Sequence, residues 1–214
     1  MNKYHKISTV FKRDPENNFK TLLFGEFATP ELEYLQDNMW VFTEKVDGTN
    51  IRVQYDYDGE VHFRGKSDNA QIPAFLIDKL QSMFDSDSMK TMFSGDKLNG
   101  LTACLYGEGY GAKIQKGGGN YRQDQSFVLF DIKIGEWWLK REDVEDIGNK
   151  LNIDVVPIIG IGTLHRMIRM AQEGFKSTWG DFLAEGIVAR PKIELKTRSG
   201  QRIITKIKYK DFPR

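Results

Sequence analysis

Residues 44–53 read EKVDGTNIRV, shortly after the apolar run MWVF and at the start of a segment in which apolar and polar residues alternate. This order places Lys45 at the end of a buried strand, with an acid and a glycine close behind it. Burying an ammonium group costs several kcal/mol unless its charge is paired with an opposite charge, takes part in chemistry, or is lost by deprotonation. The stretch therefore allows two interpretations of Lys45: an ordinary residue at a strand edge before an Asp-Gly turn, or a residue placed there for chemistry.

The composition is that of an ordinary globular protein. The 214 residues are 40% hydrophobic, and 31 Lys and Arg residues nearly balance 30 Asp and Glu residues. A chain of this length can bury a sizeable core. Balanced charge excludes a strong global basic field, so nucleic-acid binding would have to rest on local residues. No stretch approaches the about 18 apolar residues of a membrane span, and no signal peptide is evident. We expect a cytoplasmic monomer that binds no membrane.

Hydrophobic periodicity and turn residues predict a mixture of helices and strands. Helices are predicted at residues 72–84, 141–151 and 164–175. Strands are predicted at residues 101–108, 126–134, 154–161, 184–195 and 202–212, and hairpins at residues 51–66 and around Ser199-Gly200. The Gly-rich, charged segment 111–125 predicts a mobile surface loop. No Pro-rich or Ser-rich linker divides the chain, so we expect one α+β domain over residues 1–214, built on antiparallel sheet.

Four further motifs follow the lysine along the chain. They are YGEGYG at residues 106–111, FVLFDI at 127–132, AEGIVAR at 184–190 and TKIKYK at 205–210. A Lys-x-Asp-Gly string alone arises by chance in roughly 5% of chains of this length and is a weak signal. The joint occurrence of all five motifs in this order is far more specific, and it favours the chemical interpretation of Lys45.

With these motifs, the chain resembles the covalent nucleotidyltransferase superfamily of polynucleotide ligases and mRNA capping enzymes. Within it, the chain is most similar to the ATP-dependent RNA ligase family. The resemblance implies a nucleotidyltransferase fold, an ATP-grasp-like ligase adenylyltransferase domain of antiparallel sheets flanked by helices. It also implies ATP and Mg²⁺ or Mn²⁺ as cofactors, and RNA with 3′-OH and 5′-phosphate ends, possibly in a nicked duplex, as the partner. The ends would be joined through a lysyl-AMP intermediate and an adenylylated 5′ end.

The resemblance makes Lys45 the nucleophile and gives catalytic roles to Lys206 and Lys208. A lysine is almost entirely protonated at neutral pH, so burial or nearby cations must lower the pKa of Lys45 before it can attack phosphorus. Lys206 and Lys208 are two residues apart on a predicted strand and therefore face one side. There they would neutralise charge that develops on phosphorus and also lower the pKa of Lys45.

The resemblance also implies a set of nucleotide contacts. The set consists of Glu44, Val46, Asp47, Gly48, Asn50, Lys66, Glu108, Phe127 and Glu185. Within it, Glu108 would bind a ribose hydroxyl, Phe127 would stack on the adenine face, and Glu185 would bind the metal. One glutamate suffices for Mg²⁺, which prefers few carboxylates together with waters and phosphate oxygens. Two ordinary alternatives stay open: a loop acid for Glu108 and a core side chain for Phe127.

Two features depart from the family pattern. After the first hairpin the family usually has an arginine, where this chain has Lys66 with Arg64 nearby, and lysine lacks the planar fork for a bidentate contact. The chain also stops just after its last motif, where larger ligases and capping enzymes carry an OB-fold or helical module, so we expect no C-terminal OB-fold. RNA would then bind a small patch. Its candidate residues are Arg64, Lys113, Lys116, Arg122 and Lys210.

Two alternative functions remain open at this point. The first is a minimal ATP-dependent DNA ligase or a capping-type guanylyltransferase on the same scaffold, although those enzymes rely heavily on the OB-fold. The second is a nucleotide or nucleic-acid binding module without catalysis. The presence of Lys45, Glu185, Lys206 and Lys208 together argues against lost catalysis, because a decayed site would be expected to lose at least one of them.

Overall fold

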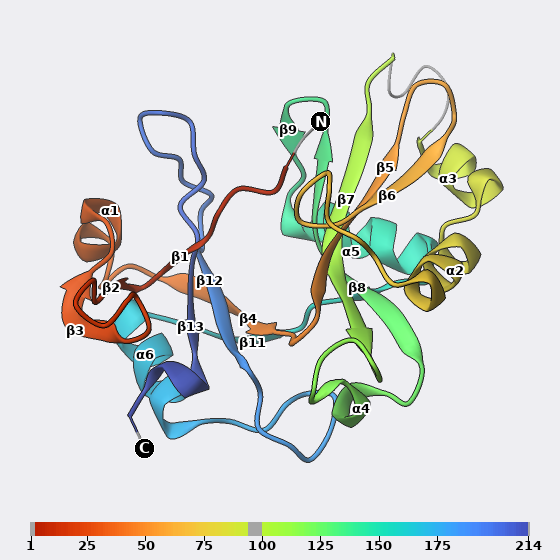
Figure 1. The fold of residues 1–214 in the computed structure, drawn as a ribbon. Coiled ribbons are helices and arrows are strands. Elements are labelled where there is room, and N and C mark those ends of the chain that lie inside the picture. The colour runs from red at the N-terminus through yellow and green to blue at the C-terminus, as the bar shows by residue number, and fades with distance from the viewer. Residues whose placement is uncertain (1–2, 94–99, 214) are drawn as a thin grey trace. The chain divides into compact units, whose positions relative to one another are not determined.

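The computed structural model describes residues 3–93 and 100–213 (Figure 1). The chain forms two compact units. Unit 1 contains the N-terminal residues up to Tyr4 and the segment Asp47–Val156, and unit 2 contains His5–Val46 and the chain from Pro157 onward. The expectation of one domain over residues 1–214 stays a prediction. Each unit is assembled from two segments that are separated in sequence, so no linker composition marks the division.

Unit 1 is built on a six-stranded sheet with the order β10-β8-β7-β5-β6, in which β9 also pairs with β8. Its strands are β5 (Thr49–Tyr55), β6 (Val61–Arg64), β7 (Ala103–Gly111), β8 (Gln125–Ile134), β9 (Trp137–Trp138) and β10 (Asp154–Val155). All pairings are antiparallel except that of β10 with β8. The predicted hairpin at residues 51–66 is confirmed as β5 and β6, and its turn uses Gly59 at a φ of +86°.

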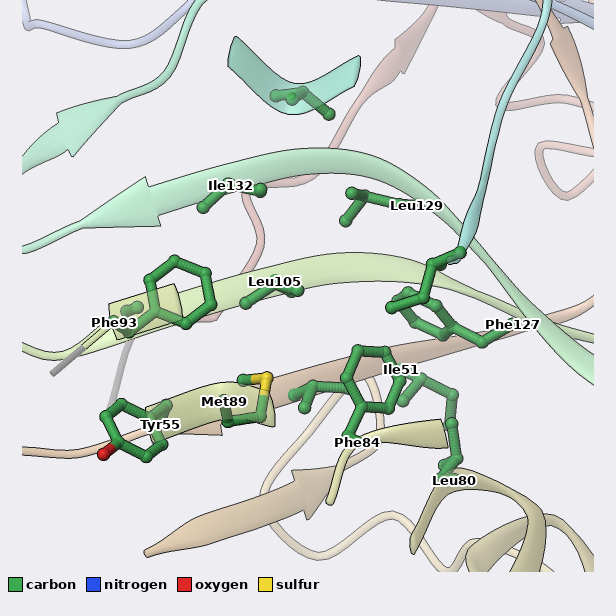
Figure 2. Close-up of a cluster of buried hydrophobic side chains, with 14 of the residues drawn as sticks. Ile51, Tyr55, Leu80, Phe84, Met89, Phe93, Leu105, Phe127, Leu129 and Ile132 are labelled. Atoms are coloured by element: carbon green, nitrogen blue, oxygen red, sulfur yellow. The ribbon is translucent and has the colours of Figure 1, made fainter. Parts of the chain in front are cut away.

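Helices complete unit 1 and cover its core. They are α2 (Ala74–Met83), α3 (Ser86–Phe93), α4 (Gly118–Tyr121) and α5 (Arg141–Lys150). Alternate residues of the strands, such as Ile51 and Leu105, point into an apolar cluster together with Leu80 and Phe84 of the helical side (Figure 2). This alternation is the two-residue period of a strand with one buried face. The segment predicted as a surface loop contains the short helix α4.

Unit 2 contains a five-stranded sheet with the order β1-β13-β12-β4-β11 and a separate pair, β2 with β3. Its strands are β1 (Ser8–Thr9), β2 (Phe11–Arg13), β3 (Leu22–Phe27), β4 (Trp40–Lys45), β11 (Ile158–Gly162), β12 (Gly186–Pro191) and β13 (Thr205–Lys208). Its helices are α1 (Pro30–Tyr34), α6 (Leu164–Glu173) and the 3₁₀ helix η1 (Tyr209–Asp211). One face of the sheet, with Trp40, Phe42 and Ile187, packs into the core of the unit.

The expected α+β class with antiparallel sheet is confirmed, and so are the helices α2, α5 and α6. Helix α6 begins after Thr163, whose side chain accepts a hydrogen bond from the backbone N–H of Arg166, an N-cap arrangement. The short helices α1 and α3 were not predicted, because five to eight residues give too few turns for a clear apolar period. In the part of the chain that the structure describes, no helix is long and apolar enough to span a membrane.

Candidate functional site

The candidate site begins with the register of three neighbouring strands in unit 2. Gly186 of β12 lies opposite Lys45 of β4 on one side and opposite Lys208 of β13 on the other. Val188, two residues along β12, lies opposite Lys206. Residues two apart on a strand share a face, so all three lysines lie on the face opposite the core residues of the sheet. The prediction that Lys206 and Lys208 face one side is confirmed.

Glu185 connects two of these lysines. Its Oε2 lies 2.6 Å from Lys45 Nζ, and its Oε1 lies 2.6 Å from Lys208 Nζ. The side chains are largely enclosed, with 18%, 23% and 10% of Lys45, Lys208 and Glu185 exposed. Short charge-assisted hydrogen bonds of this kind are strong, and each fixes the orientation of its partner. Three residues that the sequence predicted as functional, from three different strands or strand ends, therefore meet at one carboxylate.

This arrangement carries excess positive charge. Two ammonium groups, those of Lys45 and Lys208, share one carboxylate. A partly enclosed cationic surface attracts anions such as a phosphate chain. Glu185 supplies hard oxygen atoms that suit Mg²⁺ or Mn²⁺. Among the described residues, no group of three or more His, Cys, Asp or Glu side chains could hold a metal ion by itself. An ion at Glu185 would therefore also need oxygen atoms from water or a phosphate.

Glu44 does not join this group. It is 1% exposed, and as the neighbour of Lys45 in β4 it points to the opposite face of the sheet. Its carboxylate accepts hydrogen bonds from Ser177 Oγ at 2.6 Å and from Thr178 N and Oγ1, each at 2.9 Å. The carboxylate of Glu44 is therefore bound by the segment that connects α6 to Glu185, and the nucleotide contact of Glu44 stays a prediction. The neighbouring Val46 is also buried, and its carbonyl accepts a hydrogen bond from Lys45 Nζ.

In unit 1, the Asp-Gly turn of the opening motif is held in place by its neighbours. The backbone N–H of Asp47 donates to Tyr121 Oη at 3.1 Å, and the carbonyl of Gly48 accepts from Gln115 Nε2 at 3.2 Å. A Cβ at Gly48 would lie 2.5 Å from the carbonyl oxygen of Gly109. This position therefore requires glycine, because the strand β7 passes too close for any side chain.

Asn50 and Glu108 form a polar pair on the face of the unit 1 sheet that is opposite the core. The two residues lie opposite each other on β5 and β7. Asn50 Oδ1 is buried and has no hydrogen-bond partner among the described residues. Because a buried polar atom without a partner is costly, such an atom indicates a position that a ligand or water completes. The structure thus brings together two of the residues that were predicted to contact the nucleotide.

Phe127 lies on the other face, and its predicted stacking on adenine is corrected. The ring is 0% exposed and packs edge-on against Phe84, with centroids 5.2 Å apart (Figure 2). It also fills the space over Gly107, where a Cβ would lie 2.2 Å from the ring. Phe127 is therefore a core side chain, which is the alternative that the sequence left open.

A bulge in β8 explains how a different aromatic residue reaches the open face. Leu129 lies opposite Gly107 and Asp131 opposite Tyr106, so Phe130 is an extra residue between two paired positions. Phe130 is half-buried and contacts Tyr4 edge-on, with centroids 5.1 Å apart. The Tyr4 hydroxyl donates to Asp131. No local pattern in the sequence indicates these contacts, because they join residues about 127 positions apart.

Lys66 lies exposed in the turn after β6, and a buried arginine holds that turn. Arg52, 1% exposed, donates from Nε to the carbonyl of Gly65 and from Nη2 to Asp68 Oδ1, both at 2.8 Å. The hydrogen bond from Arg52 holds the pKa of Asp68 below its ordinary value. Arg64, the second candidate, is half-buried and lies opposite Arg52. The sequence did not predict that Arg52 supports this turn.

The predicted RNA-binding patch is only partly available. Lys113 and Lys116 are exposed. Arg122, by contrast, makes two hydrogen bonds to Asp124, at 2.6 and 3.0 Å, and this pairing raises the pKa of Arg122. Lys210 is exposed, but it lies in η1 and does not continue the face of Lys206 and Lys208. The roles of Arg122 and Lys210 in RNA binding therefore stay predictions.

Comparison with known proteins agrees with the motif order. The sequence profile of the RNA ligase family matches residues 38–209. No curated protein sequence matches significantly. Among solved structures, a Naegleria gruberi RNA ligase variant with ATP and Mn has a TM-score of 0.66 at 18% identity, over 99% of this chain and 60% of that chain.

A second variant of that ligase with ATP and Mn has a TM-score of 0.64 at 19% identity, over 84% of this chain and 52% of that chain. A third, with AMP and Mn, has a TM-score of 0.64 at 18% identity, over 98% of this chain and 58% of that chain. At this identity the likeness shows a shared fold. The chain spans between 52% and 60% of the length of these three structures.

Proposed function

We propose that this chain, which belongs to the RNA ligase family, is an ATP-dependent RNA ligase that joins a 3′-OH end to a 5′-phosphate end through a lysyl-AMP intermediate. The observation that carries the proposal is the meeting of Lys45 and Lys208 at Glu185, on a sheet face with excess positive charge. The similar Naegleria ligase variants hold ATP or AMP with Mn, and this supports ATP with Mg²⁺ or Mn²⁺ as the cofactors here.

In the first step, Lys45 Nζ attacks the α-phosphorus of ATP. The N–P bond forms, the bond from phosphorus to the pyrophosphate oxygen breaks, and pyrophosphate leaves. Lys45 must give up a proton for this attack, and Glu185 Oε2, 2.6 Å away, is in position to accept it. Lys208 and Lys206, on the same face, would hold the phosphate oxygens and stabilise the negative charge that develops on them.

In the later steps, an oxygen of the RNA 5′-phosphate attacks the phosphorus of AMP, and the N–P bond to Lys45 breaks. A 3′-hydroxyl then attacks the phosphorus of the 5′-phosphate, the phosphodiester bond forms, and AMP leaves. Glu185 is the residue that would hold a divalent ion together with phosphate oxygens, and such an ion would supply further charge neutralisation. Asn50 and Glu108 are the proposed nucleoside contacts, supported by their pairing in register and by the unpartnered Asn50 Oδ1.

The test is covalent labelling with ATP that carries the label on its α-phosphate, followed by denaturing electrophoresis and peptide mapping. Mapping is essential because Lys45 and Lys208 both touch Glu185. We expect the label on Lys45, none in Lys45→Ala, and wild-type labelling in Lys210→Ala, a control at an exposed lysine nearby.

Three outcomes would overturn the proposal. Labelling of the Lys45→Ala variant would show that Lys45 is not the nucleophile. Labelling by GTP in place of ATP would indicate a capping-type guanylyltransferase. Sealing of DNA nicks but not of matched RNA nicks would indicate a DNA ligase. The last measurement requires nicked duplexes in which the sugar on each side of the nick is exchanged separately.

A further inference from the structure

The segment 192–203, which we call the arm, forms a hairpin that connects β12 to β13. Its two sides pair at Lys196 and Arg202, and the backbone N–H of Ile203 donates to the carbonyl of Leu195 at 2.9 Å. At the tip, the N–H of Thr197 donates to the carbonyl of Gln201 at 2.7 Å. Figure 1 shows the arm extending beyond β12 and β13, at the end of these strands opposite η1. The arm is thus an ordered extension of β12 and of β13, the strand that carries Lys206 and Lys208.

The charges of the arm do not cancel. Its single acid, Glu194, is paired with Arg202, whose guanidinium binds both carboxylate oxygens and is 2% exposed. Lys192, Lys196 and Arg198 are exposed, and none of them makes an ion pair within the described part of the chain. Three cations therefore remain uncompensated on a small surface.

The spacing of these cations favours a linear polyanion. Lys192 lies in the bend after β12, Lys196 at the bridge to Arg202, and Arg198 in the turn at the tip. The three cations are therefore spread along one side of the hairpin, at separations of at most about 14 and 7 Å. A site for one phosphate would need converging donors, whereas a row of cations fits a row of phosphates. The basic helix α6 offers no comparable row, because Arg166 donates to the carbonyl of Ile161 and His165 lies 3.5 Å from Asp37.

We propose that the arm binds the phosphate backbone of RNA at a distance from the ends being joined, an inference that rests on the proposed function. Ten residues separate Gly186, which lies between Lys45 and Lys208, from Lys196. At the rise of a strand this is a distance of up to about 30 Å. RNA that reaches from the reacting ends to an arm at that distance would extend for about one helical turn, and we expect much shorter RNA to miss the contact.

The experiment compares nicked RNA duplexes with about 8 and about 20 base pairs on each side of the nick, lengths that fall below and above this reach. Binding is measured across a salt series for the full chain and for the triple variant Lys192→Gln, Lys196→Gln and Arg198→Gln. A matched control removes three exposed cations of unit 2 outside the arm. Its substitutions are Lys6→Gln, Lys20→Gln and Arg169→Gln. Lysyl-AMP formation and thermal unfolding are measured in parallel for every variant.

We expect the arm variant to bind the long duplex about tenfold more weakly at low salt, with a slope of log K against log salt that is shallower by about 2.7. Its binding to the short duplex and its lysyl-AMP yield should equal those of the wild type, and the control should bind both duplexes normally. Unchanged binding of the long duplex, or equal losses on both lengths, would overturn the role of the arm. Absence of lysyl-AMP in the wild type would instead overturn the proposed function.

Discussion

The open faces of the two sheets differ in how well their functional residues can be identified. In unit 2, Lys45, Lys206 and Lys208 share one face, and Glu185 joins two of them. In unit 1, Asn50 and Glu108 share the open face, whereas Phe127 lies in the core. The difference arises from the strands. The paired parts of β4, β12 and β13 keep an unbroken register, but β8 contains a bulge at Phe130, three residues after Phe127. The alternation of side chains along a strand predicts which face of the sheet a residue lies on only where no bulge interrupts the pairing.

The largest effect should come from the shared carboxylate of unit 2. Glu185→Ala leaves two ammonium groups facing each other without their anion, and we expect the rate of lysyl-AMP formation at saturating ATP to fall at least about 100-fold. Glu185→Gln keeps the shape and tests the charge alone. Activity should vanish with EDTA and return with Mg²⁺ or Mn²⁺. Full adenylylation by Glu185→Ala would show that the contacts of Glu185 with Lys45 and Lys208 are only structural. The functional residues of unit 2 would then be no better identified than those of unit 1.

The second test concerns the back of the same sheet. Glu44→Ala removes the acceptor for Ser177 Oγ and Thr178 N, so we expect the free energy of unfolding to fall by about 2–4 kcal/mol. Denaturant unfolding measures this loss, and the KM for ATP of the folded fraction should stay near that of the wild type. Ser177→Ala is the milder companion variant. A raised KM for ATP with an unchanged free energy of unfolding would instead indicate that Glu44 contacts the nucleotide.

The third test compares the two faces of β8 through one substitution made at two positions. Phe127→Leu should lower the free energy of unfolding by about 1–2 kcal/mol, because it removes volume from a closed core, and leave the KM for ATP unchanged. Phe130→Leu, at a half-buried ring outside the core, should change the KM more than the stability. Thermal unfolding and adenylylation kinetics separate the two. The opposite pattern would mean that the bulge does not decide which aromatic residue is functional.

The smallest effect concerns the surface of unit 1. Replacing Lys113 and Lys116 by Gln should weaken RNA binding a few-fold and reduce the salt slope by about 0.9 for each phosphate that the variant no longer neutralises. Arg122→Gln should add little, since its charge is already compensated by Asp124. Lysyl-AMP yield should not change in either variant. A loss of the adduct would place this segment at the nucleotide, and unchanged RNA affinity would show that the two lysines are merely solvated.

Much of the site in unit 2 could be predicted from the sequence. The family resemblance carried by the motifs implies roles for Lys45, Glu185, Lys206 and Lys208, and the two-residue period places Lys206 and Lys208 on one face. The same period also implies that Glu44 points away from Lys45, because adjacent residues of a strand face opposite sides. The sequence therefore already indicated that Glu44 and Lys45 face opposite sides. The resemblance placed both residues in one motif and so assigned both to the nucleotide.

The remainder depends on contacts that no local pattern encodes. Phe130 reaches the open face through a bulge, whose position is set by pairing with β7. The hydroxyl of Tyr4 donates a hydrogen bond to Asp131, although the two residues are 127 positions apart in the sequence. The two units are each assembled from separated segments, so neither composition nor a linker marks their boundary. The strands and helices of regular period were therefore predictable, whereas their pairing irregularities and long-range partners were not.

Gly186 gives the unit 2 site its dimensions. A Cβ at this position would lie 2.2 Å from the carbonyl oxygen of Ile207 and 2.7 Å from Lys208 Cα, both backbone atoms that cannot move aside as a flexible side chain would. Any other residue would force β12 away from β13 and lengthen the gap that one carboxylate now bridges. The absence of a side chain at Gly186 thus sets the spacing between β12 and β13. This spacing lets the carboxylate of Glu185 contact the ammonium groups of Lys45 and Lys208 at the same time.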